Sequence, residues 1–408
     1  MPVYLIGTLD TKGQEIGFVR DELRALGLKV AIVDASCLNA PKIPADISRE
    51  TVFEAAGTTL AEVRAANDRG HAVTTAARGV AALITRLHAE GTVEGVIGLG
   101  GSAGTTIATA GMRVLPIGVP KVMASTLASG QVRPYVGDKD IFMLNTIVDV
   151  SGINRISRIV LGEAARAMAG LVTLRKTHAT ASDKPVIAAT MFGVTTPCVE
   201  RARQVLEEAG YEVLVFHATG TGGQAMESLI ADGVIAGVLD ITTTELADEL
   251  VGGVLTAGPT RLTAAGRKGI PQVISVGALD MVNFGPRETV PAKFADRKFY
   301  HHNPSVTLMR TTVDENKQLG EEIARKAAAG TGPTSIVFPL RGVSAIDREG
   351  QPFDDRPARE ALLDALRRNH GSVELIELDQ HINDPEFAEA AARKLLDMLT
   401  SDLHLAAD

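Results

Sequence analysis

Cysteine and tryptophan are the scarcest residues of this sequence, whose 408 residues include two cysteines and no tryptophan. Cys37 and Cys198 stand too far apart for a Cys-x-x-Cys pair, so the sequence supports neither a disulfide framework nor a cysteine-based zinc site. Because unpaired cysteines suit a reducing compartment, we expect the protein to be cytoplasmic.

Positive charge and long apolar runs are also lacking. Lysine and arginine number 41 against 49 acidic residues, and the net charge of −8 argues against binding to nucleic acid through the phosphate backbone. The longest uncharged run, residues 95–112, holds six glycines and several hydroxyl side chains and is no membrane span. The first residues form no basic leader, so we expect a soluble protein without a signal peptide.

Strand-like and helix-like segments alternate along the chain. Short β-rich runs followed by longer segments of helical period predict an α/β fold with mainly parallel sheets. The first unit is predicted as a strand over residues 2–7, a helix over 14–26 and a strand over 29–34. A helix over 153–174 closes the first half, and the polar stretch 176–184 is typical of a linker.

The second half repeats this organisation, with seven strands predicted between residues 185 and 379. We therefore predict two Rossmann-like domains, residues 1–178 and 179–408. A gapless offset of 183 aligns Gly27 with Gly210 and Asp34 with His217. Two explanations stay open, namely a duplication and the general likeness of any two strand–helix–strand units.

The strongest local signal is a glycine-rich segment in which a predicted strand ends and a helix begins. Its residues are Gly98, Leu99, Gly100, Gly101, Ser102, Ala103, Gly104 and Thr105. Backbone N–H groups in such a turn, together with the helix N-terminus, form a site for phosphate or carboxylate. Neither the P-loop lysine nor the dinucleotide spacing of glycines is present, so the pattern indicates an anion without naming it. Close strand–helix packing is the alternative role of the glycines.

The turn after the first strand gathers other groups that suit a nucleotide. Lys12 is able to reach a phosphate, and Asp10 to hold a metal or a ribose, next to the Thr8 hydroxyl. The alternative is that Asp10 caps the following helix. Asp34 ends the second strand, where many nucleotide-binding folds bond a ribose hydroxyl. Asp138, in a charged turn further on, is a candidate Mg²⁺ ligand or a solvated turn residue.

In the second half, four polar residues end predicted strands: His217, Asp240, Asp280 and Arg341. Because the carboxyl ends of parallel strands meet at one edge, we expect a polar crevice there for an anionic small molecule. His217, which a second glycine-rich turn follows, would act as general acid or base. Residues 242–245 are predicted to form a capping box and to be structural.

Four separated segments carry a family resemblance, namely residues 7–13, 98–105, 217–227 and 280–285. They resemble the ATP-binding N-terminal region of the tomato mosaic virus resistance protein and its microbial relatives, over essentially the whole chain. The resemblance implies two α/β subdomains, a nucleotide held by the first one, and a homodimer. It assigns the nucleotide to the matching positions, which are Thr8, Asp10, Lys12, Gly101, Ser102, Gly104 and Thr105.

Three functions therefore stand as hypotheses. The first is an ATP-binding protein that holds the triphosphate on the Gly98–Thr105 turn, with Mg²⁺ bound through Asp10 or Asp138. The second is an enzyme of small-acid catabolism with an anionic substrate near His217. The third is a non-catalytic protein in which a nucleotide sets the geometry of a dimer. The sequence alone leaves open whether the protein is an enzyme.

Overall fold

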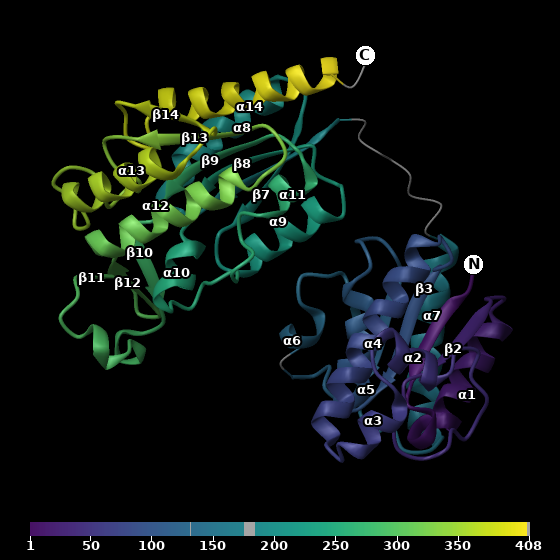
Figure 1. Ribbon diagram of the computed structural model, residues 1–408. Helices are drawn as coiled ribbons and strands as arrows, with labels where there is room; N and C mark the ends of the chain where they lie inside the picture. The colour runs from purple at the N-terminus through teal and green to yellow at the C-terminus, as the bar shows by residue number, and fades with distance from the viewer. Residues whose placement is uncertain (131, 175–183, 406–408) are drawn as a thin grey trace. The chain divides into compact units, whose positions relative to one another are not determined.

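The computed structural model describes residues 1–130, 132–174 and 184–405 (Figure 1). The chain divides into an N-terminal unit, residues 1–181, and a C-terminal unit, residues 182–408. The predicted boundary between residues 178 and 179 lies outside the described residues, as does most of the predicted linker. Each unit has its own buried core around a parallel sheet, so the predicted mainly parallel α/β fold is confirmed.

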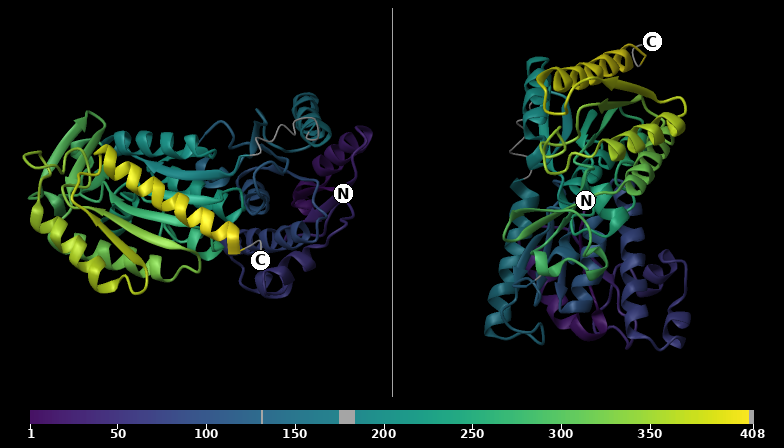
Figure 2. Two further views of the ribbon diagram at one scale, coloured as in Figure 1. Left: turned by 90° about the horizontal axis from the view of Figure 1, so that it is seen from above. Right: turned by 90° about the vertical axis from the view of Figure 1, so that its left-hand side faces the viewer.

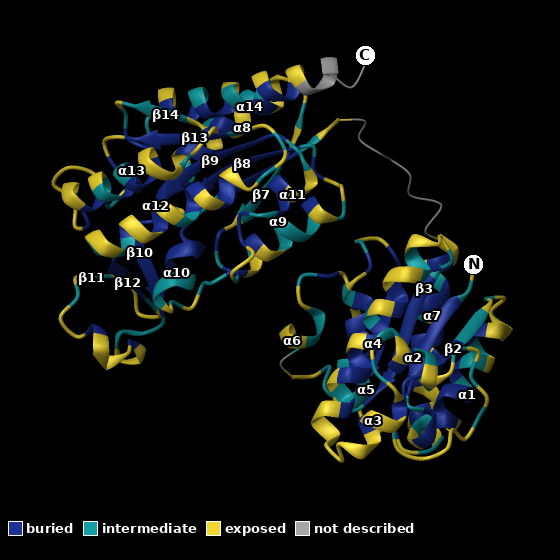
Figure 3. Ribbon diagram, viewed as in Figure 1, coloured by how far each residue is buried: buried dark blue, intermediate teal, exposed yellow. Residues whose placement is uncertain are grey.

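The N-terminal unit is built on a five-stranded parallel sheet in the order β2-β1-β3-β4-β5. Its strands are β1 (Val3–Gly7), β2 (Val30–Asp34), β3 (Gly95–Gly100), β4 (Lys121–Ser125) and β5 (Phe142–Asn145). Every residue of β1, β3 and β4 is buried, which explains why β1 and β3 are continuous apolar runs rather than alternating ones. Figure 3 shows this buried sheet between partly exposed helices.

Helices cover both faces of that sheet. The helices are α1 (Leu9–Ala25), α2 (Arg49–Ala55), α3 (Leu60–Ala65), α4 (Arg69–Ala89), α5 (Ser102–Arg113), α6 (Arg133–Val136) and α7 (Arg155–Leu174). Helices α1 and α7 pack together on one face, and α2, α4 and α5 share the core of the other. Helix α1 starts five residues before the predicted helix, and a kink at Lys12 separates its first turn from the rest. The Asp34 carboxylate accepts the N–H of Leu9 in this first turn at 3.2 Å.

The C-terminal unit contains a six-stranded parallel sheet in the order β14-β13-β9-β8-β6-β7. Its strands are β6 (Val186–Met191), β7 (Glu212–His217), β8 (Gly237–Thr242), β9 (Gln272–Gly277), β13 (Thr334–Pro339) and β14 (Glu374–Leu378). The longer helices are α8 (Thr196–Glu208), α9 (Thr221–Ala231), α10 (Glu245–Val251), α12 (Val313–Ala328), α13 (Arg356–Asn369) and α14 (Pro385–Leu405). Helix α14 lies along α8 on one face of this sheet (Figure 2).

A small antiparallel sheet, which the sequence did not predict in full, extends this unit. Its order is β10-β12-β11, with strands β10 (Met281–Phe284), β11 (Phe299–Asn303) and β12 (Val306–Arg310). The short helices of the unit are α11 (Ala264–Lys268) and the 3-10 turns η2 (Gly193–Thr195), η3 (Arg287–Thr289) and η4 (Ala292–Phe294). Among the described residues, no helix combines the length and the apolar character needed to cross a membrane.

The two units share one strand order. In each of them the first strand lies between the second and the third, so the winding of the chain reverses beside the first strand. Ligands of open α/β sheets bind at this reversal, outside the carboxyl ends of the two strands that flank it. A duplication would produce the shared order, which is also common to unrelated flavodoxin-like folds.

Candidate functional site

The reversal in the N-terminal unit lies between β1 and β3, and both predicted nucleotide turns are located there. The β1–α1 turn begins at Thr8, and the β3–α5 turn comprises Gly100 and Gly101. Since β1 and β3 are hydrogen-bonded neighbours that run in parallel, the two turns lie side by side at one edge of the sheet. The structure thus brings Thr8 close to Gly100–Ser102.

The β3–α5 turn has the backbone geometry of an anion site. Gly100 adopts a φ of +151°, and a Cβ there would lie 3.1 Å from the Cα of Gly104, so this position requires glycine. A Cβ on Gly101 would meet only the Thr126 hydroxyl, at 3.6 Å, which leaves the backbone open to a ligand. Among the described residues no side chain caps the N-terminus of α5, and Ser102 at its first position is exposed.

Thr105 lies inside this turn rather than on its surface. Its side chain is fully buried, and its hydroxyl donates to the carbonyl oxygen of Gly101 at 2.8 Å and lies 2.6 Å from the Ser125 hydroxyl. Ser125 in turn accepts the N–H of Leu127 at 3.0 Å. Thr105 therefore fixes the shape of the turn from within, and this role differs from the ligand contact that the resemblance implied.

The β1–α1 turn offers one exposed hydroxyl pair. The Thr8 and Thr11 hydroxyls lie 2.8 Å apart, and no side chain caps α1 at Thr8. The Lys12 ammonium, which was predicted to reach a phosphate, instead donates to the carbonyl oxygen of Val150. Thr8 is therefore the side chain of this turn that remains available to a ligand at the edge of the sheet.

The two carboxylates at this edge of the sheet, those of Asp34 and Asp10, bind backbone N–H groups. Asp34 is 2% exposed, and one of its oxygens accepts the N–H groups of Leu9, at 3.2 Å, and Ser36, at 2.9 Å. Asp10 is 6% exposed, and its Oδ2 accepts the N–H groups of Leu38 at 3.3 Å and Asn39 at 3.2 Å. Both carboxylates thus hold the loop that follows β2 against the β1–α1 turn.

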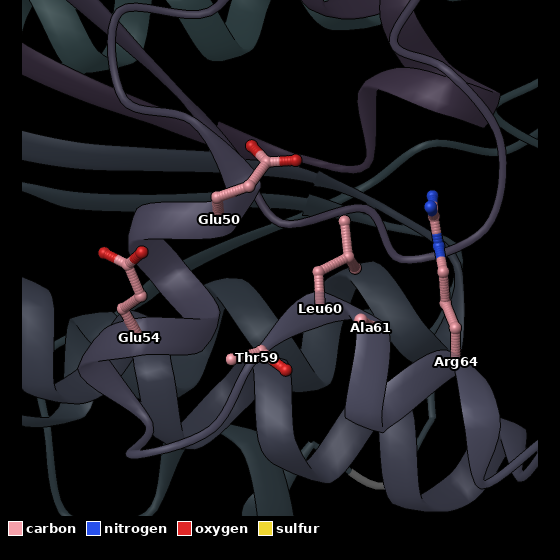
Figure 4. A pocket seen from close by; sticks show the side chains of 6 residues that line it. All are labelled: Glu50, Glu54, Thr59, Leu60, Ala61 and Arg64. Atoms are coloured by element: carbon pink, nitrogen blue, oxygen red, sulfur yellow. The ribbon is translucent and has the colours of Figure 1, made fainter.

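Two cavities lie beside this loop, each of about 340 Å³. The first lies between α2 and α3, where Glu50, Leu60 and Arg64 point to the same side (Figure 4). The second, which we call the β2 cavity, is lined by residues 37–39 of the loop after β2 and by residues of the segment 63–72. Arg64 borders both cavities.

Asp138 lies at the opposite, amino edge of the sheet. Its turn precedes β5, and the adjacent Asp140 contacts Lys121, the first residue of β4, at 2.6 Å. Burial lowers the pKa of Arg113, at the end of α5, and the charge of the nearby Asp138 opposes this effect. Because α5 runs from the carboxyl edge to the amino edge, Asp138 cannot share an ion with Asp10. Of the two alternative Mg²⁺ ligands, Asp138 thus lies away from the carboxyl edge, where Asp10 and the glycine-rich turn are found.

In the C-terminal unit, Asp240 belongs to a buried ion cluster that sequence reasoning missed. The Arg261 guanidinium binds both oxygens of Asp240, at 2.5 and 2.7 Å, and donates from Nε to Glu245 at 2.6 Å. Its Nη1 also lies 3.4 Å from Glu227. Arg261 is 1% exposed, Asp240 1% and Glu245 0%. Arg261 stands in a loop without a recognisable motif, so no local signal marks it.

The carboxylate of Glu245 also occupies the anion-binding position of the second glycine-rich turn. Its Oε1 accepts the N–H of Gly220 at 2.7 Å and of Gly223 at 3.1 Å, at the N-terminus of α9. Burial raises the pKa of Glu245, and Arg261 counteracts this. The predicted capping box over residues 242–245 is wrong, because the cap position is Thr244 and no side chain caps α10 there. This turn binds an anion, and the anion is the protein's own carboxylate.

The structure does not gather the four residues predicted for the second crevice. His217 is exposed at the end of β7, with its ring 5.4 Å from that of Phe192. Arg341 follows β13 and pairs at the surface with Asp379 at 2.7 Å. Four strand spacings separate β7 from β13, which places His217 and Arg341 roughly 19 Å apart.

Asp280 and a further carboxylate, Asp248, are buried in this unit. Asp280 accepts the Ser344 hydroxyl at 2.8 Å, and burial, followed by the neighbouring Asp347, raises its pKa to about 7. Asp248 accepts the backbone N–H of Asn283 at 3.0 Å and its side-chain amide at 2.7 Å. Burial raises the pKa of Asp248 to about 7 as well. The two carboxyls with raised pKa values thus belong to separate hydrogen-bond networks.

Comparisons with known proteins agree with the division of the chain. Residues 1–177 and 184–399 match the N-terminal and C-terminal domains of the uncharacterised protein family UPF0261. A UPF0261 protein of Clostridium tetani is 49% identical over 97% of this chain and 98% of its own length. The ToMV resistance protein Tm-1(GCR237) of Solanum lycopersicum is 41% identical over 99% of this chain and 56% of its own length.

Solved structures show only a remote likeness. The UDP-N-acetylglucosamine 2-epimerase of Rickettsia bellii is 10% identical, with 98% of this chain and 97% of the epimerase covered and a TM-score of 0.22. The UDP-bound MnaA of Staphylococcus aureus has a TM-score of 0.20 at 11% identity, over 100% of this chain and 98% of that chain. Likeness at this level supports no argument about ligands.

Proposed function

The chain belongs to the UPF0261 family, and we propose that it is a nucleotide-binding protein whose N-terminal unit holds the phosphates of ATP on the Gly98–Thr105 turn. The observation that carries this proposal is the uncapped N-terminus of α5 behind an open glycine turn, at the reversal of the sheet. Phosphate suits such a turn because several N–H groups and the helix dipole point at it.

The contacts around the turn narrow the set of ligand residues. We assign the phosphate to the backbone of Gly101, the N–H and hydroxyl of Ser102, and the Thr8 hydroxyl across from them. Lys12, Asp34 and Thr105 already bind other parts of the protein, so they shape the site. We propose ATP as the nucleotide because the sequence resembles an ATP-binding region, while the geometry of the turn supports a phosphate.

Mg²⁺ enters this proposal only with the phosphates of the nucleotide. Within the described residues, no cluster of three or more His, Cys, Asp or Glu side chains is arranged to hold a metal. Asp138 lies at the far edge, and one oxygen of Asp10 already accepts two N–H groups. The side chains therefore do not fit a metal held by the protein alone. Mg²⁺ commonly binds through one or two carboxylates plus substrate phosphates, which leaves Asp10 as the nearest candidate.

We further propose a cytoplasmic homodimer. Apolar side chains stay exposed on the N-terminal unit, with Phe142 52% and Ile159 51% exposed, on the edge strand β5 and on α7. A second copy that covers them would remove this apolar surface from water. Light scattering on the purified protein tests the dimer. A strictly monomeric mass at micromolar concentration would contradict it.

The small-acid enzyme is not retained as a second function. Its four proposed residues lie in separate networks, and Asp240 is fully engaged by Arg261. No contact favours a shared substrate site for His217 and Arg341, which lie four strands apart.

Calorimetric titration tests the nucleotide site. ATP, ADP, AMP and NAD are titrated with and without Mg²⁺ into the wild type, Gly101→Val, and Gly101→Val combined with Ser102→Ala. A Cβ fits at Gly101 without a clash, and the φ of −83° suits valine, so the fold should persist while the branched side chain blocks the turn. The matched control is Gly170→Val, because a Cβ at Gly170 meets nothing within 4 Å.

We expect wild type and Gly170→Val to bind ATP with micromolar affinity, and both Gly101 variants to lose it by at least about a hundredfold. Binding that survives in the Gly101 variants would move the site elsewhere. No binding of any nucleotide to the wild type would refute the proposed function.

A further inference from the structure

We infer that the β2 cavity holds the nucleoside part of the nucleotide whose phosphates lie on the β3–α5 turn. This inference rests on the proposed function and adds the direction in which the ligand extends. The alternatives along the edge of the sheet are the side of β4 and the side of β2. The contacts of both sides, the position of the cavity and its lining decide between them.

The side of β4 contributes the Thr126 hydroxyl, which lies beside Gly101 and thus near the phosphates of the proposed ligand. The Ser125 hydroxyl, at the end of β4, is already hydrogen-bonded to the Thr105 hydroxyl and to the N–H of Leu127. Ser125 itself is completely buried.

The side of β2 offers a cavity lined by the loop that follows this strand. Two strand spacings separate β3 from β2, so the end of β2 lies about 10 Å from the glycine turn. A nucleotide bound at one end through its phosphates spans such a distance. The Asp10 carboxylate links the two places, because it belongs to the β1–α1 turn and binds the N–H groups of Leu38 and Asn39 in the cavity wall.

The wall of the cavity is held in place before any ligand arrives. Arg64 donates to the carbonyl oxygens of Cys37 and Leu38, each at 2.6 Å, and Arg49 donates to that of Asn39. Together with the Asp10 contacts, the C=O groups of residues 37–39 and the N–H groups of Leu38 and Asn39 are bonded to the rest of the unit. A preformed wall lowers the entropy cost of binding.

The lining matches a heterocyclic base joined to a sugar. Val63 and Ala72 are buried apolar residues of the wall, and Leu38 stands at its rim with 61% of its side chain exposed. Polar and charged residues also line the cavity, namely Asn39, Arg64, Asn67, Asp68 and Arg69. Small-molecule sites combine mainly apolar walls with a few polar groups, in volumes from about 300 Å³ upward. The cavity of about 340 Å³ lies at the small end of this range.

Cys37 provides a probe inside the cavity. It is one of only two cysteines, and the other, Cys198, is completely buried. Burial raises the pKa of the Cys37 thiol, and the Asp10 carboxylate raises it further, so alkylation is carried out with an uncharged reagent at mildly alkaline pH. The rate of modification of Cys37 then reports whether the cavity is filled, and Cys198 serves as the internal control.

The experiment compares ATP with inorganic tripolyphosphate on the wild-type protein. Calorimetry first establishes whether each of them binds, and alkylation is then followed at saturating concentrations by mass spectrometry. We expect both to bind, and only ATP to slow the modification of Cys37, by about tenfold or more.

The three contrary results are distinct. Binding of both without any protection would place the nucleoside outside the cavity and overturn this inference, while the phosphate site would stand. Equal protection by tripolyphosphate would show that the cavity takes phosphate, which also overturns it. No binding of either would refute the proposed function itself, and this inference with it.

A variant pair provides the second arm. Leu38→Glu places a charge at the rim of the cavity, and we expect it to weaken ATP binding about tenfold while it leaves tripolyphosphate binding within twofold. The control is Leu26→Glu, since Leu26 is also an exposed leucine, 41% exposed, but follows the end of α1 at the amino edge. Equal ATP affinity of the two variants would overturn the inference.

Discussion

Replacement of Arg261 by methionine is predicted to destabilise the C-terminal unit strongly. Arg261 is the guanidinium that binds Asp240 and Glu245, and all three residues are at most 1% exposed. Methionine fills a similar volume but leaves two buried carboxylates without a counter-charge. Removing one partner of a buried ion pair costs about 3–5 kcal/mol of unfolding free energy. The second carboxylate places this variant at the upper end of the range.

The matched control is Arg341→Met. Arg341 binds both oxygens of Asp379 in the same bidentate way, at 2.9 and 2.7 Å, but both side chains are more than 60% exposed. Exposed ion pairs gain little because water and salt screen them, so we expect no measurable change. Both arginines bind an aspartate through two hydrogen bonds, but Arg261 is buried and also binds Glu245, whereas Arg341 is exposed and binds Asp379.

Urea unfolding followed by hydrogen exchange of peptides from β8 measures this effect, because such peptides report the C-terminal unit alone. The loss in Arg261→Met should also shrink as the pH falls from 8 to 5. The stranded carboxylates have raised pKa values in the folded variant, and such groups contribute stability at low pH that is lost as the pH rises through those values. A loss below about 1 kcal/mol, or one independent of pH, would refute the reasoning.

Two further substitutions follow from the same unit. Asp248→Asn removes a carboxyl whose folded pKa is about 7. Its contribution to the stability of the wild type is present at low pH and lost as the pH rises through 7, so between pH 5 and 7.5 the variant should gain roughly 2–3 kcal/mol relative to the wild type in urea titrations. A difference between variant and wild type that stays constant with pH would contradict this. Gly220→Ala is expected to lower the melting temperature by several degrees, because Gly220 has a φ of +84° and a Cβ would lie 2.6 Å from the carbonyl oxygen of Thr256. Gly193→Ala, with nothing within 4 Å, serves as control, and equal melting temperatures would contradict the prediction.

Most strands of the two parallel sheets could be predicted, because burial on both faces gives them mainly apolar sequences. The edge strand β5, which is partly exposed, was missed. The first strand, for example, was predicted over residues 2–7 and lies at Val3–Gly7. The antiparallel sheet was harder, since β11 contains His301 and His302 and is largely exposed. Its existence depends on pairing with β12, which is a tertiary contact. Helix α1 begins earlier than its periodicity suggests, and the N–H of Leu9 in its first turn donates to Asp34, in the next strand of the chain.

The location of the candidate site could be predicted from the sequence more readily than the residues that would contact a ligand there. Glycines at a strand end fix where backbone N–H groups are open, and the sequence displays them directly. Whether a polar side chain at the site is available to a ligand depends on hydrogen-bond and ion-pair partners that lie far away in the sequence. Lys12 binds the backbone at Val150, and Asp240 binds Arg261, in neither case within one element. Such pairs leave no local pattern in the sequence. Charged residues at strand ends were therefore assigned to a ligand, although they bind other groups of the protein.

The comparison of the two sheet reversals explains why one of them is the better ligand site. In the C-terminal unit, the glycine-rich N-terminus of α9 already holds a carboxylate, that of Glu245, and Arg261 balances the charge beside it. A phosphate would have to displace from this turn a buried carboxylate that already accepts two backbone N–H groups. In the N-terminal unit, no described side chain caps the N-terminus of α5, and the loop after β2 is held by Asp10 and Arg64 beside a cavity. The same strand order therefore supports an internally saturated turn in one unit and, as we propose, a turn that binds an external anion in the other.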